Sequence, residues 1–239
     1  MFGQKRIPSR EGGVEIVVEE LCTRMVAQGH NVTCYNRGGH HVSGSEYDSK
    51  RLKEYKGIKL KTVPTIEKKG LAAVSSSFFA ALCCAFGQYD IVHIHAEGPA
   101  FFAWLPKMFG KKVIVTIHGL DWQREKWKSG FGSKFIHQGE KNAVKFADEI
   151  IVLKKGMILN KGTTDILLKE IQNHVWECFV NMDQINLFED KFIVSNRKYT
   201  ENGAVLRIIS TNQPALNAKK VEPSLEDLYL YYFREEGEN

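Results

Sequence analysis

The sequence predicts an α/β protein that begins with a Rossmann-like, doubly wound parallel sheet. Two observations support this prediction: short strand segments alternate with helical segments up to residue 153, and most of these strands are apolar on both faces. Parallel sheets that are covered by helices on both sides have strands of this kind. A third observation limits the prediction, because the alternation stops at residues 147–153 and hairpin patterns follow. We therefore expect two domains, at residues 1–153 and 154–239.

The elements of the first domain follow from hydrophobic spacing. In residues 14–29, apolar side chains recur on one helical face, and Gly29 stands at the usual position of a helix end. Residues 1–3 stand where a first strand should end, but they are too few to form one, so the first strand is expected to be truncated. The other expected elements are strands at 32–35, 58–63, 91–95, 113–118 and 150–153, and helices at 71–86, 99–109 and 134–146.

The second domain is expected to be a small α+β region of hairpins with a terminal helix. Asn202-Gly203 is a turn signal between two strand patterns. Pro223-Ser224 followed by Asp227 is typical of a helix start with a capping box. The other expected elements are a hairpin at 154–162, a short helix that Thr163 or Thr164 caps and that runs to residue 170, and strands at 175–180, 192–194 and 205–209.

The two expected domains differ in charge. Residues 1–153 carry a formal net charge of +7 and residues 154–239 carry −2, which together give the +5 of the chain. A basic domain suits an anionic partner such as a nucleotide, a phosphate or an acidic membrane face. A solvated basic surface without such a partner explains the charge equally well.

Several classes of site are not supported by the sequence. Five cysteines without a CxxC pair predict neither a disulfide framework nor structural zinc. The longest apolar run, residues 71–86, is shorter than the ~20 residues that a membrane-spanning helix needs. GxGxxG and GxxxxGK[ST] are absent, so neither a dinucleotide fingerprint nor a P-loop is predicted. The start of the chain has no signal-peptide pattern, and we expect a cytoplasmic protein.

Three loops at the carboxyl ends of the expected strands could carry chemistry, at residues 3–13, 96–99 and 119–128, because ligands of doubly wound sheets bind there. Gly12-Gly13 opens a helix, whose free N–H groups and positive end favour a phosphate or carboxylate, although most such glycine pairs form tight turns. His118 ends a buried strand and can hydrogen-bond a hydroxyl or phosphate oxygen. A strand-end histidine bonded to a neighbouring carbonyl is the simpler interpretation of His118.

Other residues near these loops have two interpretations each. His93 and His95 lie on one face of a strand, as metal ligands could, but no third ligand has a suitable spacing, and structural histidines are the better prediction. Trp122 and Trp127 are either packing residues or a platform on which a sugar could stack.

The combined spacing of these motifs resembles the N-terminal domain of family 4 glycosyltransferases, in particular rhamnosyltransferase-like members. The resemblance covers nearly all of residues 1–153. It rests on an R-x-I-P loop ahead of a glycine pair and on two later strands that end in histidine. The matching residues are Gly3-x-x-Arg6-Ile7-Pro8-x-x-x-Gly12-Gly13-x-Glu15, Gly29-His30-x-Val32-Thr33-x-Tyr35, Asp90-Ile91-Val92-His93-Ile94-His95 and Val115-Thr116-Ile117-His118-Gly119-Leu120-Asp121.

The resemblance implies half of a GT-B fold and a retaining, metal-independent transfer of a sugar from a nucleotide sugar, in polysaccharide or glycolipid biosynthesis. It implies that Gly12 and Gly13 approach the donor diphosphate and that His118, as the catalytic residue, contacts the transferred sugar or helps to shape the reaction centre. No cofactor is implied beyond the donor substrate. The acceptor would be a sugar or lipid-linked molecule, with peripheral contact at the inner face of the membrane and no nucleic acid. The remaining residues that would line the substrate site are Arg6, Glu97, Gly119, Asp121 and Arg124.

Residues 154–239 depart from this family, because no pair of glutamates there has the context of the family's donor-binding motif. Residues 147–239 instead look like the C-terminal end of an ABC transporter ATPase subunit. The motifs are Ala147-Asp148-Glu149-Ile150-Ile151-Val152-Leu153-x-x-Gly156 and Val221-Glu222-Pro223-Ser224-Leu225-Glu226-Asp227-Leu228. The parts of that family that handle ATP are absent from the sequence, so this likeness implies an accessory region without nucleotide chemistry.

Three hypotheses about function follow. The chain is a glycosyltransferase-family enzyme that keeps its acceptor-side domain, a binding module that needs a partner for catalysis, or a non-catalytic chimera of two unrelated pieces. We expect family membership with little or no independent catalysis. Whether the chain is an enzyme by itself stays open at this stage.

Overall fold

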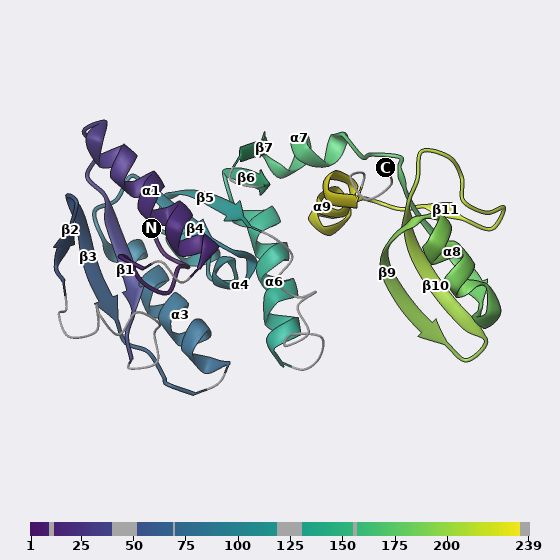
Figure 1. The fold of residues 1–239 in the computed structure, drawn as a ribbon, viewed down its shortest axis with the longest axis horizontal. Coiled ribbons are helices and arrows are strands. Elements are labelled where there is room, and N and C mark those ends of the chain that lie inside the picture. Colours follow the sequence, from purple (N-terminus) through teal and green to yellow (C-terminus); the bar gives the residue numbers. More distant parts are fainter. Residues whose placement is uncertain (10–11, 40–51, 69, 119–130, 155–156, 235–239) are drawn as a thin grey trace. The chain divides into compact units, whose positions relative to one another are not determined.

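The computed structural model describes residues 1–9, 12–39, 52–68, 70–118, 131–154 and 157–234 (Figure 1). The chain forms two compact units, Met1–Thr163 and Thr164–Asn239. Both combine helices with sheets, and the first contains parallel strands, so the predicted α/β class is confirmed. No helix among the described residues is long and apolar enough to cross a membrane.

The first unit alternates strands and helices as the sequence predicts. Its first elements are α1 (Gly13–Ala27), β1 (Thr33–Arg37), β2 (Glu54–Tyr55), β3 (Ile58–Val63), α3 (Leu71–Phe86) and β4 (Ile91–His95). They are followed by α4 (Glu97–Ala100), α5 (Trp104–Met108), β5 (Lys112–Ile117), α6 (Phe131–Phe146), β6 (Glu149–Lys154) and β7 (Met157–Gly162).

Two sheets form the centre of this unit, in the orders β1-β3-β2 and β4-β5-β6-β7. The pairs β1–β3, β4–β5 and β5–β6 are parallel, whereas β2 and β7 are antiparallel edge strands. Neighbouring residues of β1 point to opposite faces: Cys34 Sγ lies 3.3 Å from Cys22 Sγ of α1, and Tyr35 Oη lies 2.9 Å from Tyr89 Oη, beyond the end of α3. Helical elements therefore lie on both faces of β1, as in other doubly wound sheets.

The first residues of the chain lie between the two sheets. Phe2 forms a parallel bridge with Ile94 of β4, and its N–H donates to the His93 carbonyl oxygen at 3.1 Å. On the other side, the Tyr35 N–H donates to the Met1 carbonyl oxygen at 3.0 Å. Among the described residues before α1, only Phe2 makes such a bridge, so the first strand is as short as the sequence predicts.

One expected helix, at residues 99–109, is divided into α4 and α5. The cause is Pro106, which has no N–H to donate to the carbonyl oxygen four residues before it. That oxygen, on Phe102, instead accepts from the Leu105 N–H at 3.1 Å, which is a tighter turn than an α-helix has. The prediction of one continuous helix was wrong for this reason.

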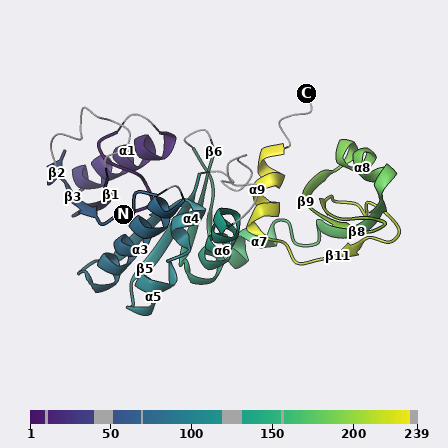
Figure 2. The same cartoon turned by 90° about the horizontal axis from the view of Figure 1, so that it is seen from below.

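The second unit contains an antiparallel sheet, in the order β11-β8-β10-β9 (Figure 2). The expected hairpin around Asn202 is present, because β9 pairs with β10 across it. The helix α8 was not predicted, although its Ile185 and Phe188 pack against the sheet. The elements are α7 (Thr164–Lys169), β8 (Val175–Asn181), η3 (Met182–Gln184), α8 (Ile185–Lys191), β9 (Ile193–Thr200), β10 (Gly203–Ile209), β11 (Lys219–Lys220) and α9 (Leu225–Arg234).

A buried polar network joins α9 to β9 and β10. Asp227, which is 0% exposed, accepts from Ser195 Oγ at 2.6 Å and from Arg207 Nη2 at 2.9 Å. The Ser224 N–H donates to the same carboxylate at 2.7 Å, and the Asp227 N–H donates back to Ser224 Oγ at 3.3 Å. This exchange is the predicted capping box, with aspartate in place of the usual glutamate.

Candidate functional site

The candidate site lies in the first unit, at the carboxyl edge of its parallel strands. Strands β1 and β4 end here at Arg37 and His95, and His118 directly follows the end of β5. The N-terminal segment, residues 1–9, runs past the same edge toward α1, whose first turn contributes Glu15. The strand order thus brings together residues that are far apart in the sequence, as doubly wound sheets do.

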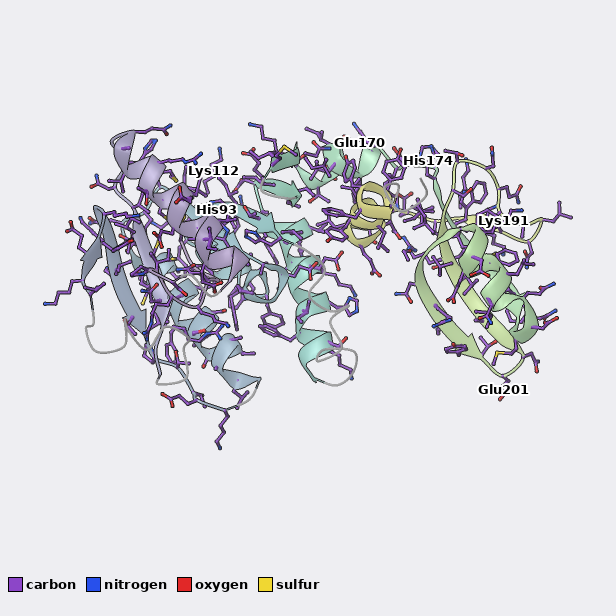
Figure 3. All side chains as sticks on the ribbon, viewed as in Figure 1. His93, Lys112, Glu170, His174, Lys191 and Glu201 are labelled. Carbon is purple, nitrogen blue, oxygen red and sulfur yellow. The ribbon has the colours of Figure 1, made fainter. Side chains whose placement is uncertain are left out.

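Three histidines form a connected group on β4 and β5 (Figure 3 labels His93). His93 Nε2 lies 2.6 Å from Thr116 Oγ1, and its ring stacks on that of His95 with centroids 4.2 Å apart. His95 Nδ1 lies 3.1 Å from His118 Nε2. His93 and His95 are thus held by neighbouring side chains, as structural histidines are. The ring of His118 is paired with the imidazole of His95, and its role stays a prediction.

Burial keeps this histidine group neutral. Desolvation lowers the pKa of His93 to about 3 and that of His118 to about 4, although the Glu15 carboxylate opposes the shift at His118. The pKa of His95, which is 0% exposed, is also well below its usual value because of burial. At neutral pH these rings can donate or accept hydrogen bonds, but they carry no charge. His118 can therefore orient a ligand and is a poor proton donor to a leaving group.

The two glycines at the start of α1 differ in the space around them, because the Glu15 side chain lies beside only one of them. The Lys5 N–H donates to Glu15 Oε1 at 2.9 Å, and a Cβ added to Gly12 would lie 1.9 Å from Glu15 Oε2. A side chain at position 12 would therefore displace the end of the Glu15 side chain. A Cβ on Gly13 would meet no atom within 4 Å, so Gly13 is open. Glu15 also places a carboxylate near the positive end of α1, which is electrostatically favourable.

The backbone of this edge is tightly constrained at two positions. Gly3 has φ +118°, and a Cβ there would lie 2.1 Å from the His95 carbonyl oxygen. Ala96, directly after His95, has φ +77°, which is unfavourable for any residue with a side chain. Such strain costs about 1–3 kcal/mol and is concentrated at functional sites. The next residue, Glu97, is 0% exposed and begins α4.

The remaining predicted site residues are placed only in part. Arg6 is half-buried in the N-terminal segment. Gly119, Asp121 and Arg124 lie outside the described residues, as do Trp122 and Trp127. No finding tests the role of any of these residues, and all of them stay predictions.

Sequence reasoning missed the end of β1, because the strand was expected to stop at residue 35. Asn36 fixes the N-terminal segment: its Nδ2 donates to the Ile7 carbonyl oxygen at 2.8 Å, and the Ile7 N–H donates to its Oδ1 at 3.0 Å. Arg37 follows it at the site. The signal was available in the sequence, because both are polar residues directly after an apolar strand.

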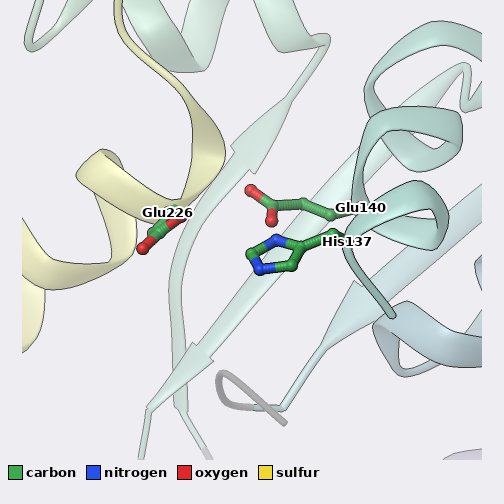
Figure 4. A group of neighbouring side chains, drawn as sticks. All are labelled: His137, Glu140 and Glu226. Carbon is green, nitrogen blue, oxygen red and sulfur yellow. The ribbon is translucent and has the colours of Figure 1, made fainter. Parts of the chain in front are cut away.

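Figure 4 shows a second group of polar side chains, of which His137 and Glu140 lie one turn apart on α6. Glu226, also drawn, belongs to α9 in the other unit. A catalytic zinc site takes three protein ligands, and the first unit offers two here. The pair carries no metal prediction.

The comparison with known families decides the classification. The family described as Glycosyltransferase Family 4 matches residues 11–158, which is more than half of the chain. The chain belongs to glycosyltransferase family 4. This confirms the resemblance of the first domain. No curated protein matches the chain. The comparisons give no support to the likeness between residues 147–239 and an ABC transporter ATPase subunit, which stays a prediction.

Proposed function

We propose that the first unit is the acceptor-side half of a retaining glycosyltransferase that uses a nucleotide sugar in polysaccharide or glycolipid biosynthesis, and that the chain alone transfers little or no sugar. The observation that carries this proposal is the carboxyl edge of a family 4 domain, where the open Gly13 and the neutral His95–His118 pair lie beside Glu15. These groups offer backbone N–H donors and an uncharged hydrogen-bonding ring to a sugar diphosphate.

In this proposal, Gly13 lets the diphosphate approach the first turn of α1, while Gly12 provides the space that Glu15 occupies. His118 orients the transferred sugar through the ring nitrogen that His95 does not contact. The reaction would need no metal, because N–H groups and a helix end stabilise the charge on the diphosphate.

The donor site would be open on one side. In the described residues after Thr163, the sheet is antiparallel and does not repeat the parallel arrangement of the first unit. A donor on an open surface keeps most of its hydration, and its phosphate contacts are then weak. We therefore expect nucleotide sugars to bind no tighter than about 1 mM, or roughly −4 kcal/mol.

Calorimetry of the full chain with UDP-, GDP- and dTDP-sugars tests this proposal. One of them is expected to bind at about millimolar concentration, and Gly13→Ala should weaken it, since the added methyl group projects into open space in the free protein. Ile16→Ala, on an exposed position of the same helix, is the control and should not change binding. Micromolar binding that His118→Ala abolishes would show that the site is complete and would overturn the proposed lack of independent activity. Equal binding by Gly13→Ala would remove the role of that glycine.

For the second unit, we propose an accessory role without nucleotide chemistry, as the likeness to the end of an ABC transporter ATPase subunit implies. The sequence lacks a P-loop, so the purified chain should not hydrolyse ATP. Magnesium-dependent turnover that survives repurification would contradict this. The alternative, a non-catalytic fusion of unrelated pieces, predicts that one long DNA read across codons 140–165 keeps both halves in one gene, and a read that separates them into different genes would remove the fusion from consideration.

A further inference from the structure

A small pocket opens beside the candidate site, where the N-terminal segment and β1 face α3. Gln4, Arg37 and Ser77 are among its lining residues. Its free space is about 10 Å³, which is enough for one water molecule or one hydroxyl group. The pocket is therefore too small for a phosphate, although a single polar group of a larger ligand could enter it.

Two buried polar atoms of this pocket have no hydrogen-bond partner among the residues that the structure describes. Gln4 is 3% exposed; its Nε2 donates to the Tyr35 carbonyl oxygen at 3.2 Å, which leaves Oε1 as an unused acceptor. Arg37 Nε is an unused donor. Folded proteins pair nearly all such groups, so two unpaired atoms on residues that line one pocket need an explanation.

Because Arg37 is charged, leaving its Nε unpaired costs more free energy than leaving a neutral group unpaired. Burial lowers the pKa of its guanidinium, and the Glu15 carboxylate only partly opposes this shift. A desolvated cation with an unused N–H is favourable only when another group completes its hydrogen bonds. One water molecule has the acceptor and the donor that this requires. A ligand group that takes this place must offer the same pair of interactions.

A hydroxyl group of a ligand can pair with both unpaired atoms. It accepts a hydrogen bond from Arg37 Nε and donates its own proton to Gln4 Oε1. A carboxylate or phosphate oxygen would satisfy Arg37 but would face the Gln4 oxygen without a proton to donate. The chemistry of the pocket therefore favours a neutral polyol over an anion.

The pocket is connected to the candidate site through the N-terminal segment. The Arg37 N–H donates to the Lys5 carbonyl oxygen at 2.7 Å, and the Lys5 N–H in turn donates to Glu15 Oε1 at 2.9 Å. Gly3, which also lines the pocket, approaches the carbonyl oxygen of His95. A sugar bound at the candidate site could thus extend one hydroxyl group toward Gln4 and Arg37.

We propose that Gln4 and Arg37 bind one hydroxyl group of the sugar acceptor and so select acceptors that carry a hydroxyl at that position. The proposal rests on the proposed function, because it needs the first unit to be the acceptor side. Its test uses no nucleotide sugar, so a failure of the donor titration and a failure of this proposal are distinguishable.

The test is saturation-transfer NMR of the full chain with a panel of methyl glycosides, their singly deoxygenated forms and inorganic phosphate. At least one methyl glycoside should bind, and one deoxy form of it should bind at least about 5-fold more weakly, because both hydrogen bonds of the hydroxyl group are lost. Gln4→Glu and Arg37→Gln should weaken the binding of the parent glycoside by a similar factor. Each variant should then bind the parent glycoside and that deoxy form with equal affinity. Arg24→Gln, which removes an exposed charge from α1, is the control and should change nothing.

Thermal unfolding of each variant separates binding from folding. Gln4→Glu should remain folded, because the new carboxylate can pair with Arg37 inside the pocket, and Arg37→Lys provides a second variant that lacks the Nε donor. Three results would overturn the proposal: no glycoside binds, the folded variants bind as well as the parent chain, or only phosphate binds in an Arg37-dependent way. The second result would show that the pocket holds water only.

Discussion

Each unit of this protein has a half-buried arginine beside polar side chains, but the hydrogen bonding of the two arginines differs. In the second unit, Arg207 donates from Nε and Nη2 to Asp227, and the same carboxylate accepts from two serines. In the first unit, Arg37 Nε and Gln4 Oε1 are both unpaired, and the two residues line the same pocket. Buried polar groups that hydrogen-bond to one another hold the fold together, whereas unpaired polar groups of residues that line a pocket indicate a binding site for a ligand.

The largest expected effect on stability is at the network around Asp227. Asp227→Ala leaves Arg207 and the two serines without their shared acceptor, and it should destabilise the second unit by about 3–5 kcal/mol. Urea unfolding followed by the fluorescence of Trp176 measures this, with Asp165→Ala, at an exposed position of α7, as the control. A loss below about 1 kcal/mol would mean that the network is not structural.

Acid should destabilise the first unit through its histidines. In the unfolded chain they bind protons near pH 6.5, whereas in the folded chain the pKa of His93 is about 3 and that of His118 about 4. The unfolded state therefore binds more protons between these values, so stability is lost as the pH falls from about 6.5 toward 4, by at least about 2 kcal/mol. His93→Asn should reduce this slope, while His30→Asn, at an exposed position, should not. Equal slopes in all three proteins would contradict the burial of His93.

Close backbone approach gives a smaller effect. Gly3→Ala combines a positive φ with a contact of 2.1 Å to the His95 carbonyl oxygen, whereas Gly29→Ala has a positive φ of +89° and no atom within 4 Å. We expect a loss of about 1 kcal/mol for Gly29→Ala and about 1–3 kcal/mol more for Gly3→Ala. Chemical denaturation of both variants checks the difference. Equal losses would show that residues 1–3 can move away from β4.

The smallest expected effect on stability is at Arg37. Arg37→Met removes a desolvated cation whose Nε has no partner, so the free energy of unfolding should change by less than about 1 kcal/mol or should increase. The same denaturation experiment gives this number beside that of Asp227→Ala. If the free energy of unfolding falls by several kcal/mol in both variants, the distinction between the paired Asp227 network and the unpaired atom of Arg37 is wrong.

The elements that the sequence predicts well are those fixed by local pattern. Strand β3, helix α3 and strand β4 begin and end where apolar spacing places them, and the Ser224 cap follows from local residue types. The candidate site was predicted at Gly12, Gly13 and His118 because these residues stand in loops after strand patterns. Their roles there remain predictions.

The parts that could not be predicted depend on contacts between distant segments. Gln4 and Arg37 come together because residues 1–5 lie between β1 and β4, which no local pattern indicates. In the same way, the sequence identifies Asp227 as a capping residue but gives no sign that Arg207 of β10 is its partner. His95 meets His118 only because β4 and β5 pair in parallel register.

The central claim is tested most directly by the stabilisation that a methyl glycoside gives to the first unit, followed by hydrogen exchange of its strands. At a glycoside concentration ten times its dissociation constant, the parent chain and Asp165→Ala should gain about 1.4 kcal/mol. Arg37→Gln, which should bind at least about 5-fold more weakly, should gain no more than about 0.7 kcal/mol at the same concentration, although it is folded. A gain in Arg37→Gln equal to that of the parent chain, or no gain in any of these proteins, would contradict the claim that unpaired polar atoms mark a binding site here.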